Sequence, residues 1–553
     1  MKITYLGHAG LEVQTARATV LCDPWLSPEG TFQASWFQFP DNSHLVTPEL
    51  RRPTAVVVSH EHLDHVDPWF LAQVPSTIPI IIHRFPSPVL RRKLQAAGPR
   101  PIIELPAWEP LEIADGTSVF FVPEESPMNH DVAIVIQADG QTLLNMNDAR
   151  LAPMQMREIR TKAGGTVDVF ALQGAGASWY PMCYEYPPEK RATLSRQKRL
   201  AKFGYMVRAI RAVKPTTVIP FAGPPCFLDP ELAPLNAELT AGIFPDQQQV
   251  VDWLATRAVT NTVVMLPGDA WDAEARVKDA DPAWEGFSFA DRASYIERYA
   301  ERRRPHVEAV LSRYPHPSES LWEPFQGYFS RLLEMSPYFN GKIGMRVGFD
   351  ITGPGGGAWA VDFRPGAEGV YRDQGECSYR YWIDSRWAVP LLAGKMPWED
   401  FFLSCRFHAW RDPDMYNDHL LGLLKFAHAP ALDAVEHYET SMTFEERITI
   451  HENGCKYRVQ RYCPHAGNDL LESGEVLPGG ILRCLAHHYE FSLETGACIN
   501  GTCKALEVER LDPAGETVVP VEVAAEPAAP APGWSGALAG GYPAPRRDAV
   551  EGR

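Results

Sequence analysis

The sequence lacks any apolar run of about 18 residues or more, so we expect no membrane-spanning helix. It also lacks an excess of positive charge. Its net charge is -17, whereas nucleic acids are bound through surplus lysine and arginine, so we expect no nucleic-acid partner. The first residues contain no long apolar segment typical of a secretion signal, and the ten cysteines are scattered along the chain. Both features predict a cytoplasmic protein without a disulfide framework.

The length and composition indicate several globular domains. The chain has 553 residues, of which 45% are hydrophobic and 22% charged, as in ordinary folded proteins. Changes in pattern predict a multidomain α+β protein with domains at 1–290, 291–435 and 436–525. Residues 526–553 are rich in Ala, Pro and Gly, which predicts a flexible tail.

The N-terminal region begins with short apolar runs broken by turn residues. Residues 3–6, 11–14 and 19–22 read as three strands of a meander, and 55–58 as a buried strand. That last run leads directly into a loop rich in histidine, at the strand end where open α/β sheets usually carry their chemistry.

The loop after residue 58 predicts a metal site. Its ligand candidates are His60 and His62, which can bind one ion, and Asp64 and His65, which can turn toward a second. Imidazole and carboxylate together suit zinc, iron or manganese, whereas a structural zinc site is expected to use thiolates.

These motifs, with residues 4–10 and 21–25, resemble the metallo-β-lactamase superfamily over most of the first 230 residues. The resemblance implies an αββα sandwich, with His130 as the third histidine of the first metal and Asp148 as a bridging carboxylate. It also implies that Asp64 and Asp148 take part in catalysis. The family usually supplies a last histidine after a late strand, but residues 221–225 contain none. We therefore expect a weakened, or an open and carboxylate-rich, second metal position.

Two aromatic residues follow the predicted strand at 167–172. Trp179 and Tyr180 lie in a Gly-rich loop that we expect at the edge of the pocket, as substrate contacts. Packing within the local core would explain them equally well.

The middle region alternates predicted helices and strands. Helices are expected at 291–303 and 320–334, and a hairpin at 346–352 and 358–363. The pattern resembles small lipid-carrier-like domains attached to some metallo-β-lactamase-fold enzymes. Residues 397–416 resemble the CMP-N-acetylneuraminate hydroxylase family, which joins a Rieske centre to a metallo-β-lactamase fold in the opposite order.

The C-terminal region carries a C-x-H and a C-x-x-H motif, eighteen residues apart, formed by Cys463 and His465 and by Cys484 and His487. Two thiolates and two imidazoles can hold the two irons of a [2Fe–2S] cluster, and they can also hold zinc. The flanking stretches 468–471 and 489–498 resemble Rieske ferredoxins and oxygenases, which implies an all-β Rieske domain with its cluster. The spacing favours His487 over the adjacent His488.

A Rieske cluster beside a second metal centre indicates redox chemistry. Zinc has no redox chemistry, so cooperation between the two sites predicts non-haem iron, one or two ions, with zinc less favoured. We expect an oxygenase, a hydroxylase or N-oxygenase, that uses dioxygen on a small organic substrate. Its electrons would come from an external ferredoxin, cytochrome or flavoprotein reductase.

Two other functions fit the same motifs. One is a metal-dependent hydrolase of the metallo-β-lactamase superfamily with an accessory Rieske domain, and the other is an electron carrier without catalysis. Because a whole domain separates the two motifs in sequence, a homo-oligomer with electron transfer between chains is a further expectation.

Overall fold

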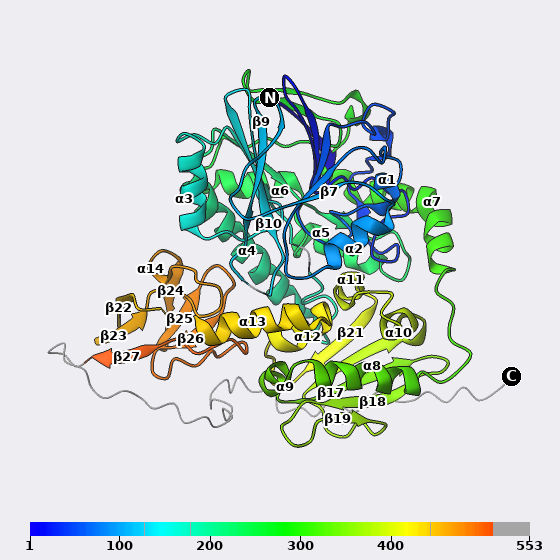
Figure 1. Cartoon of the computed structure of the whole chain (residues 1–553), viewed down its shortest axis with the longest axis vertical. Helices are drawn as coiled ribbons and strands as arrows, with labels where there is room; N and C mark the ends of the chain where they lie inside the picture. Colours follow the sequence, from blue (N-terminus) through cyan, green and yellow to red (C-terminus); the bar gives the residue numbers. More distant parts are fainter. Residues whose placement is uncertain (127, 177, 443, 512–553) are drawn as a thin grey trace.

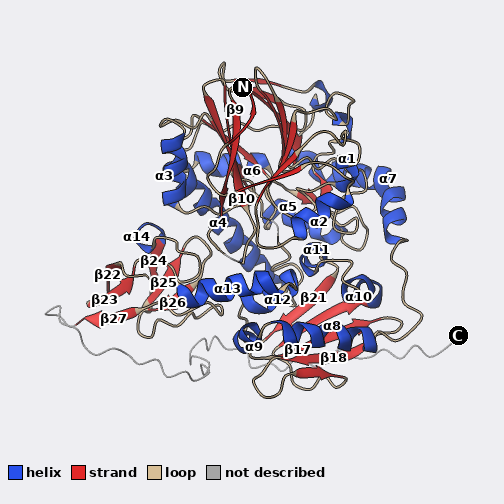
Figure 2. Cartoon of the chain, viewed as in Figure 1, coloured by secondary structure: helices blue, strands red, loops and turns tan. Residues whose placement is uncertain are grey.

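A computed structural model describes residues 1–126, 128–176, 178–442 and 444–511 (Figures 1 and 2). The predicted tail at 526–553 and the last part of the predicted Rieske domain lie outside the described residues. No helix in the described ranges is both long enough and apolar enough to cross a membrane.

The N-terminal region forms two sheets. The larger has eight strands in the order β16-β15-β1-β2-β3-β5-β6-β7, and its first three strands in sequence form the predicted meander. β5 lies parallel to β3 and β6, so all three strands end at the same edge. The strands are β1 (Lys2–Gly7), β2 (Gly10–Gln14), β3 (Thr19–Cys22), β5 (Ala55–Val58), β6 (Ile80–His83), β7 (Ile102–Leu105), β15 (Ala270–Asp272) and β16 (Val277–Asp279).

The second sheet has six strands in the order β13-β12-β11-β10-β9-β8. β11, β12 and β13 are parallel, and the remaining neighbours are antiparallel. The strands are β8 (Leu111–Ala114), β9 (Thr117–Pro123), β10 (Val132–Ala138), β11 (Gln141–Asn145), β12 (Val169–Gln173) and β13 (Thr217–Phe221). A separate short antiparallel pair is formed by β4 (Phe37–Gln38) and β14 (Pro225–Cys226).

The two sheets pack face to face, and helices cover their outer faces (Figure 2). Alternation along the strands builds these layers: Val57 of β5 joins the core between the sheets, whereas Val56 and Val58 face the helices. The predicted αββα sandwich is therefore confirmed. Its helices are α1 (Pro68–Leu71), α2 (Val89–Ala96), α3 (Pro153–Lys162), α4 (Pro188–Val213), α5 (Glu238–Ala241) and α6 (Gln247–Ala255).

The middle region is built on a five-stranded sheet in the order β19-β18-β17-β20-β21. The predicted hairpin is the antiparallel pair β17 (Arg346–Thr352) and β18 (Gly357–Asp362). The other elements are β19 (Gly369–Tyr371), β20 (Tyr379–Asp384), β21 (Phe407–Arg411), α7 (Arg292–Leu311), α8 (Trp322–Met335), α9 (Pro337–Ile343), α10 (Ser385–Leu392), α11 (Trp398–Leu403), α12 (Asp418–Phe426) and α13 (Ala429–Ser441). The likeness to lipid-carrier domains and the predicted domain boundaries stay predictions.

The C-terminal region contains two three-stranded antiparallel sheets, β22-β23-β27 and β24-β25-β26. Figure 1 shows them below the sandwich, with α12 and α13 between them and the five-stranded sheet. The elements are β22 (Arg447–Glu452), β23 (Cys455–Gln460), α14 (Leu470–Ser473), β24 (Gly474–Leu477), β25 (Ile481–Cys484), β26 (Glu490–Ser492) and β27 (Val508–Leu511).

The C-terminal region rests against the sandwich. Arg208 of α4 donates from Nη2 to the carbonyl of Leu485 at 2.7 Å, and Arg157 of α3 lies 2.8 Å from Glu472 of α14. These polar contacts position the C-terminal region against the sandwich.

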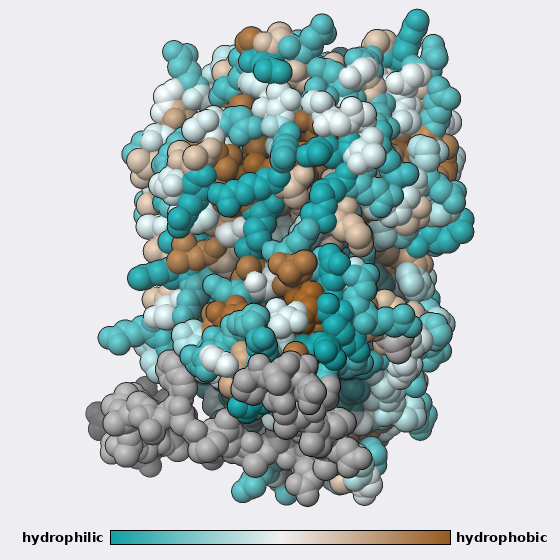
Figure 3. Space-filling view, turned by 90° about the vertical axis from the view of Figure 1, so that its left-hand side faces the viewer, coloured by the Kyte–Doolittle hydropathy of each residue, from teal (hydrophilic) through white to brown (hydrophobic). Residues whose placement is uncertain are grey.

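On the face shown in Figure 3, apolar side chains gather in small patches separated by hydrophilic ones.

Candidate functional site

The histidine loop is held by one buried carboxylate. Asp23 follows β3, and Ser59 follows the neighbouring parallel strand β5, so the two residues meet at one edge of the sheet. The Ser59 backbone N–H and hydroxyl donate to Asp23 at 2.8 and 2.6 Å, and His65 Nδ1 lies 2.9 Å from the same carboxylate. Because Asp23 accepts the Nδ1 proton of His65, the Nε2 atom of His65 is left to bind a metal.

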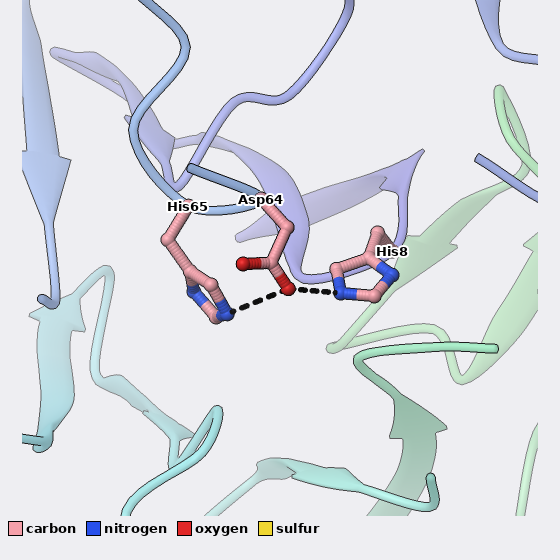
Figure 4. Close-up of side chains that lie close together, drawn as sticks. All are labelled: His8, Asp64 and His65. Atoms are coloured by element: carbon pink, nitrogen blue, oxygen red, sulfur yellow. Dashed lines mark hydrogen bonds and ion pairs between the residues drawn. The ribbon is translucent and has the colours of Figure 1, made fainter. Parts of the chain in front are cut away.

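Potential ligands converge in three overlapping groups, and within each group the ligand atoms lie within 4.8 Å of one another. In the first group, His60 Nε2 lies 2.9 Å from His62 Nδ1 and 3.7 Å from Asp131 Oδ1. In the second, Asp64 Oδ2 lies 2.8 Å from His8 Nε2 and 3.7 Å from His65 Nε2 (Figure 4).

The third group joins the other two. Asp148 Oδ1 lies 3.6 Å from His65 Nε2, and these two residues group with His60. Asp148 follows β11, and Gln173 at the end of the parallel strand β12 donates from Nε2 to Asp148 at 2.5 Å. This geometry suits a carboxylate shared between two ions, the role that the sequence predicts for Asp148.

His130 is not among these groups, although the sequence predicts it as a ligand. Its ring is stacked on Phe85, with centroids 5.1 Å apart, and lies 4.8 Å from the ring of Phe426. The next residue, Asp131, faces His60 instead. Asp131, and not His130, is therefore among the residues that the structure brings together, and the ligand role of His130 stays a prediction.

His8 is a second residue that the sequence analysis missed. It lies in the turn between β1 and β2, and its carbonyl accepts a hydrogen bond from Ala222 N–H at 2.8 Å. Ala222 belongs to the stretch in which the expected last histidine is absent. His8 therefore brings an imidazole to this position from the other end of the domain. The signal in the sequence is a histidine between two glycines at a strand turn.

The donor set fits metal ions. It comprises four imidazoles and three carboxylates, from His8, His60, His62, His65, Asp64, Asp131 and Asp148. His65 Nε2 and Asp64 Oδ1 are buried and have no hydrogen-bond partner among the described residues. Such atoms are costly unless something binds them, and a cation between them would remove that cost.

The middle region contributes a further carboxylate to this centre. Glu399 of α11 lies with Oε2 3.3 Å from His62 Nε2, and Lys425 of α12 lies 2.9 Å from Glu399 Oε1. A carboxylate on the outer nitrogen of a ligating histidine fixes its orientation and its tautomer. The middle region is therefore a structural part of the metal centre.

The electrostatics of the centre without metal are dominated by its carboxylates. Burial opposes a charge on His65, but Asp64 and Asp23 outweigh it and raise the pKa of His65 to about 10. Burial likewise opposes a charge on His62, but Glu399 raises its pKa to about 9. Burial, with repulsion from Glu124, raises the pKa of Asp131 to about 7.

The predicted cluster ligands also converge. Cys463 and Cys484 are buried, and the rings of His465 and His487 lie 4.7 Å apart. The Nδ1 atoms of both histidines are buried with no hydrogen-bond partner in the described part of the chain, which fits a group bound between them. His487, and not His488, lies beside His465, as the spacing predicts. These four residues would hold the cluster.

A direct contact connects the two candidate centres. His487 Nε2 lies 2.8 Å from Glu124 Oε1, and both side chains are almost fully buried. Glu124 follows β9, and its backbone N–H donates to the carbonyl of Asp131 at 2.9 Å. One side-chain contact and one backbone hydrogen bond therefore lead from a cluster histidine to a residue of the metal centre.

The two predicted substrate aromatics lie outside the ligand groups. Trp179 packs on Phe402 of the middle region, with ring centroids 5.3 Å apart. Tyr180 lies with its ring 5.5 Å from Lys198 Nζ. Neither contact tests the predicted catalytic role of these residues, which stays a prediction.

Two family descriptions match the chain: Beta-lactamase superfamily domain at residues 18–221 and Rieske [2Fe-2S] domain at residues 425–510. A protein of Mycolicibacterium smegmatis, provisionally named a Rieske 2Fe-2S iron-sulfur protein, is 32% identical over 537 residues. The match covers 92% of this chain and 100% of that protein. The chain belongs to this Rieske 2Fe-2S iron-sulfur protein family.

The chain is also distantly similar to a named enzyme. Cytidine monophosphate-N-acetylneuraminic acid hydroxylase of Danio rerio is 21% identical over 441 residues, 75% of this chain and 70% of that protein. The solved structure of CmlA, a diiron beta-hydroxylase from Streptomyces venezuelae, matches with a TM-score of 0.33 and 19% identity, over 48% of this chain and 53% of that one. A TM-score of 0.33 is too low to support a functional comparison with that structure.

Metal binding should release protons. The pKa values of His65 and His62 lie above 7 in the metal-free protein, at about 10 and about 9, and both imidazoles must lose a proton to bind a metal. With part of a third proton from Asp131, we expect release of roughly two to three protons per loaded centre at pH 7. The apparent metal affinity should rise with pH up to about pH 10, where both imidazoles have lost their protons. Calorimetric titration in buffers of different ionisation enthalpy measures this; binding without proton release would contradict it.

Replacement of Glu399 should weaken the metal centre. The Glu399→Gln substitution removes the charge that orients His62, and changes of this kind weaken metal binding about 10- to 100-fold. Because glutamine can still accept a hydrogen bond, we expect the lower end of that range, read as metal content after dialysis against a chelator. Glu334→Gln, on an exposed position of α8, is the matched control. Equal metal retention by the two variants would show that Glu399 does not support the centre.

Proposed function

We propose that the chain is an iron-dependent oxygenase, a hydroxylase or N-oxygenase, of a small organic substrate. The contact between His487 and Glu124 carries this proposal, because it leads from the cluster ligands to the metal centre. The cluster, when bound, supplies electrons one at a time. A hydrolytic zinc centre has no use for electrons, whereas dioxygen activation requires them.

The donor set supports iron at the metal centre. Imidazole and carboxylate without thiolate suit non-haem iron, and Asp148 is placed to be shared by two ions. We propose two irons here, held by His60, His62 and Asp131 on one side and by His8, Asp64 and His65 on the other. The distant relationship to a protein named as a hydroxylase supports the same reaction class.

The residues of the chain also have roles in this proposal. His487 Nε2 donates to Glu124, whose Oε1 accepts from Asn129 Nδ2 at 2.7 Å and whose Oε2 accepts from Arg150 N–H at 2.9 Å. These bonds hold the carboxylate between the two centres. Gln173 orients Asp148 in the same way. The small substrate, dioxygen and an external ferredoxin, cytochrome or flavoprotein reductase are the proposed partners.

We further propose that electrons pass within one chain. Both centres lie on one chain and meet through Glu124, so the transfer between chains expected from the sequence is not required. Electron transfer to the metal centre would then not require a homo-oligomer.

Metal analysis tests the proposed reaction class. Protein purified without oxygen should contain roughly four irons and two acid-labile sulfides per chain, two of the irons in the cluster. Zinc should be present at well below one ion per chain. Two irons together with stoichiometric zinc would contradict the oxygenase and favour a metallo-β-lactamase-type hydrolase with an accessory Rieske domain.

Replacement of Glu124 should separate the two centres. In Glu124→Ala, we expect the reduced cluster to be reoxidised by dioxygen roughly tenfold more slowly, since partners of ligating histidines typically contribute 10- to 100-fold to activity. Stopped-flow absorbance of the cluster measures the rate. Glu472→Gln, which removes the ion pair with Arg157 at the same junction, is the control and should keep the wild-type rate.

Mixed variants distinguish transfer within a chain from transfer between chains. A His60→Ala chain retains the cluster ligands, and a Cys463→Ala chain retains the metal-centre ligands. If electrons pass within one chain, reoxidation of the cluster in the His60→Ala chain should not speed up when the Cys463→Ala chain is added. Faster reoxidation in the mixture would contradict transfer within a chain.

A further inference from the structure

Among the described residues, three cationic side chains lie beside the metal centre without a carboxylate partner. Lys198 and Lys202 stand one turn apart on α4, so they share one face of the helix. In the described part of the chain, their ammonium groups contact neutral acceptors alone: Ser178 Oγ and Tyr180 O for Lys198, and Gln173 Oε1 for Lys202. Arg150, two residues after Asp148, is the third cation, and repulsion from it acts on both lysines.

The three cations lack such partners although the chain has more acidic than basic residues, 69 against 52. Several cations elsewhere in the described residues are paired with carboxylates: Lys93 Nζ with Asp400 at 2.7 Å, Lys425 Nζ with Glu399 at 2.9 Å, and Arg406 Nη2 with Asp229 at 2.6 Å. Loss of hydration, and then repulsion from Arg150, lower the pKa values of Lys198 and Lys202 to about 7. The charged form of each lysine is therefore destabilised in the folded chain, and an anion beside it would stabilise that form.

The nearby carboxylates do not remove this destabilisation, because each of them has another partner. Glu124 is engaged by His487, and Asp131 and Asp148 belong to the ligand groups of the metal centre. Metal ions there would add further positive charge. An anion from outside the chain is the remaining source of compensation.

We propose that Arg150, Lys198 and Lys202 form a subsite for an oxyanion, the carboxylate or phosphate group of the substrate. This inference rests on the proposed function, since it gives the substrate class of the same centre. Its position follows from two contacts: Lys202 Nζ donates to Gln173, and Gln173 donates to Asp148 at 2.5 Å. An anion bound to Lys202 would therefore be connected to Asp148 through the hydrogen bonds of Lys202 and Gln173.

The type of each residue suits this role. A guanidinium can bind an oxyanion through two parallel N–H bonds, and a lysine is a compact charge with three rotatable donors. Tyr180 lies beside Lys198, so the subsite borders one of the aromatics that the sequence predicts as a substrate contact. The substrate class is then a small organic anion bound by its acidic group near the metal centre.

Inorganic phosphate and acetate are the probes that test the subsite. With the metal- and cluster-loaded full chain, the thermal midpoint is followed against the concentration of each salt, with chloride of equal ionic strength as reference. We expect the midpoint to rise with at least one of the two oxyanions. The tighter one identifies the acidic group as phosphate or carboxylate.

The decisive variant is Lys198→Met with Lys202→Met. Bonds to a charged donor contribute enough for roughly a tenfold change in affinity each, so the dissociation constant of the oxyanion should rise at least about tenfold. The matched control is Arg196→Met with Arg211→Met, which removes two exposed cations from the same helix. It should keep the wild-type affinity. Without oxyanion, the lysine variant should be at least as stable as the wild type, because repulsion is removed.

Equal oxyanion affinity in the wild type and the lysine variant overturns the proposal, and so does the absence of any midpoint shift in the wild type. Phosphate bound by the metal ions alone would give the first of these results. If the lysine variant does not fold, Arg150→Gln provides the same comparison. These measurements need no turnover. A chain that holds zinc but binds the oxyanion through its lysines would contradict the proposed oxygenase and would still support the oxyanion subsite.

Discussion

The buried carboxylate of Asp23 is the contact on which the metal centre depends. It accepts hydrogen bonds from the backbone and hydroxyl of Ser59 and lies 2.9 Å from His65 Nδ1. The parallel pairing of β3 with β5 brings Asp23 and Ser59 to the same sheet edge. Without this contact, the loop that carries four ligand residues would have no fixed start, and His65 would have no fixed tautomer.

Each of the other two regions meets the sandwich through one contact between a carboxylate and a histidine. Glu399 from the middle region lies against His62, and Glu124 of the sandwich lies against His487 of the Rieske domain. Both contacts are buried, where an unpaired partner would be costly. The regions are therefore coupled through ligand histidines, so the positions of the metal centre and the cluster loops are set by the same interactions that hold the regions together.

The charges of the site are arranged in two parts. Carboxylates and imidazoles gather where cations would bind, and Arg150, Lys198 and Lys202 gather beside them on the α4 side. Gln173 lies between the parts and contacts both Lys202 and Asp148. A neutral amide can bridge an ammonium and a carboxylate without neutralising either, so the two charges remain available to ligands of opposite sign.

The αββα layers were implied by resemblance to the metallo-β-lactamase superfamily. The sequence alone determined local features of this protein: the strand before the histidine loop, the middle hairpin and the spacing of the cluster ligands. These depend on short-range periodicity, which a single chain displays directly. Tertiary structure decided which residues meet across long separations. His8 joins Asp64, Asp131 faces His60, and Glu124 contacts His487 because of sheet pairing and domain packing. No local pattern encodes such contacts, since their partners lie far apart along the chain and are brought together only by folding.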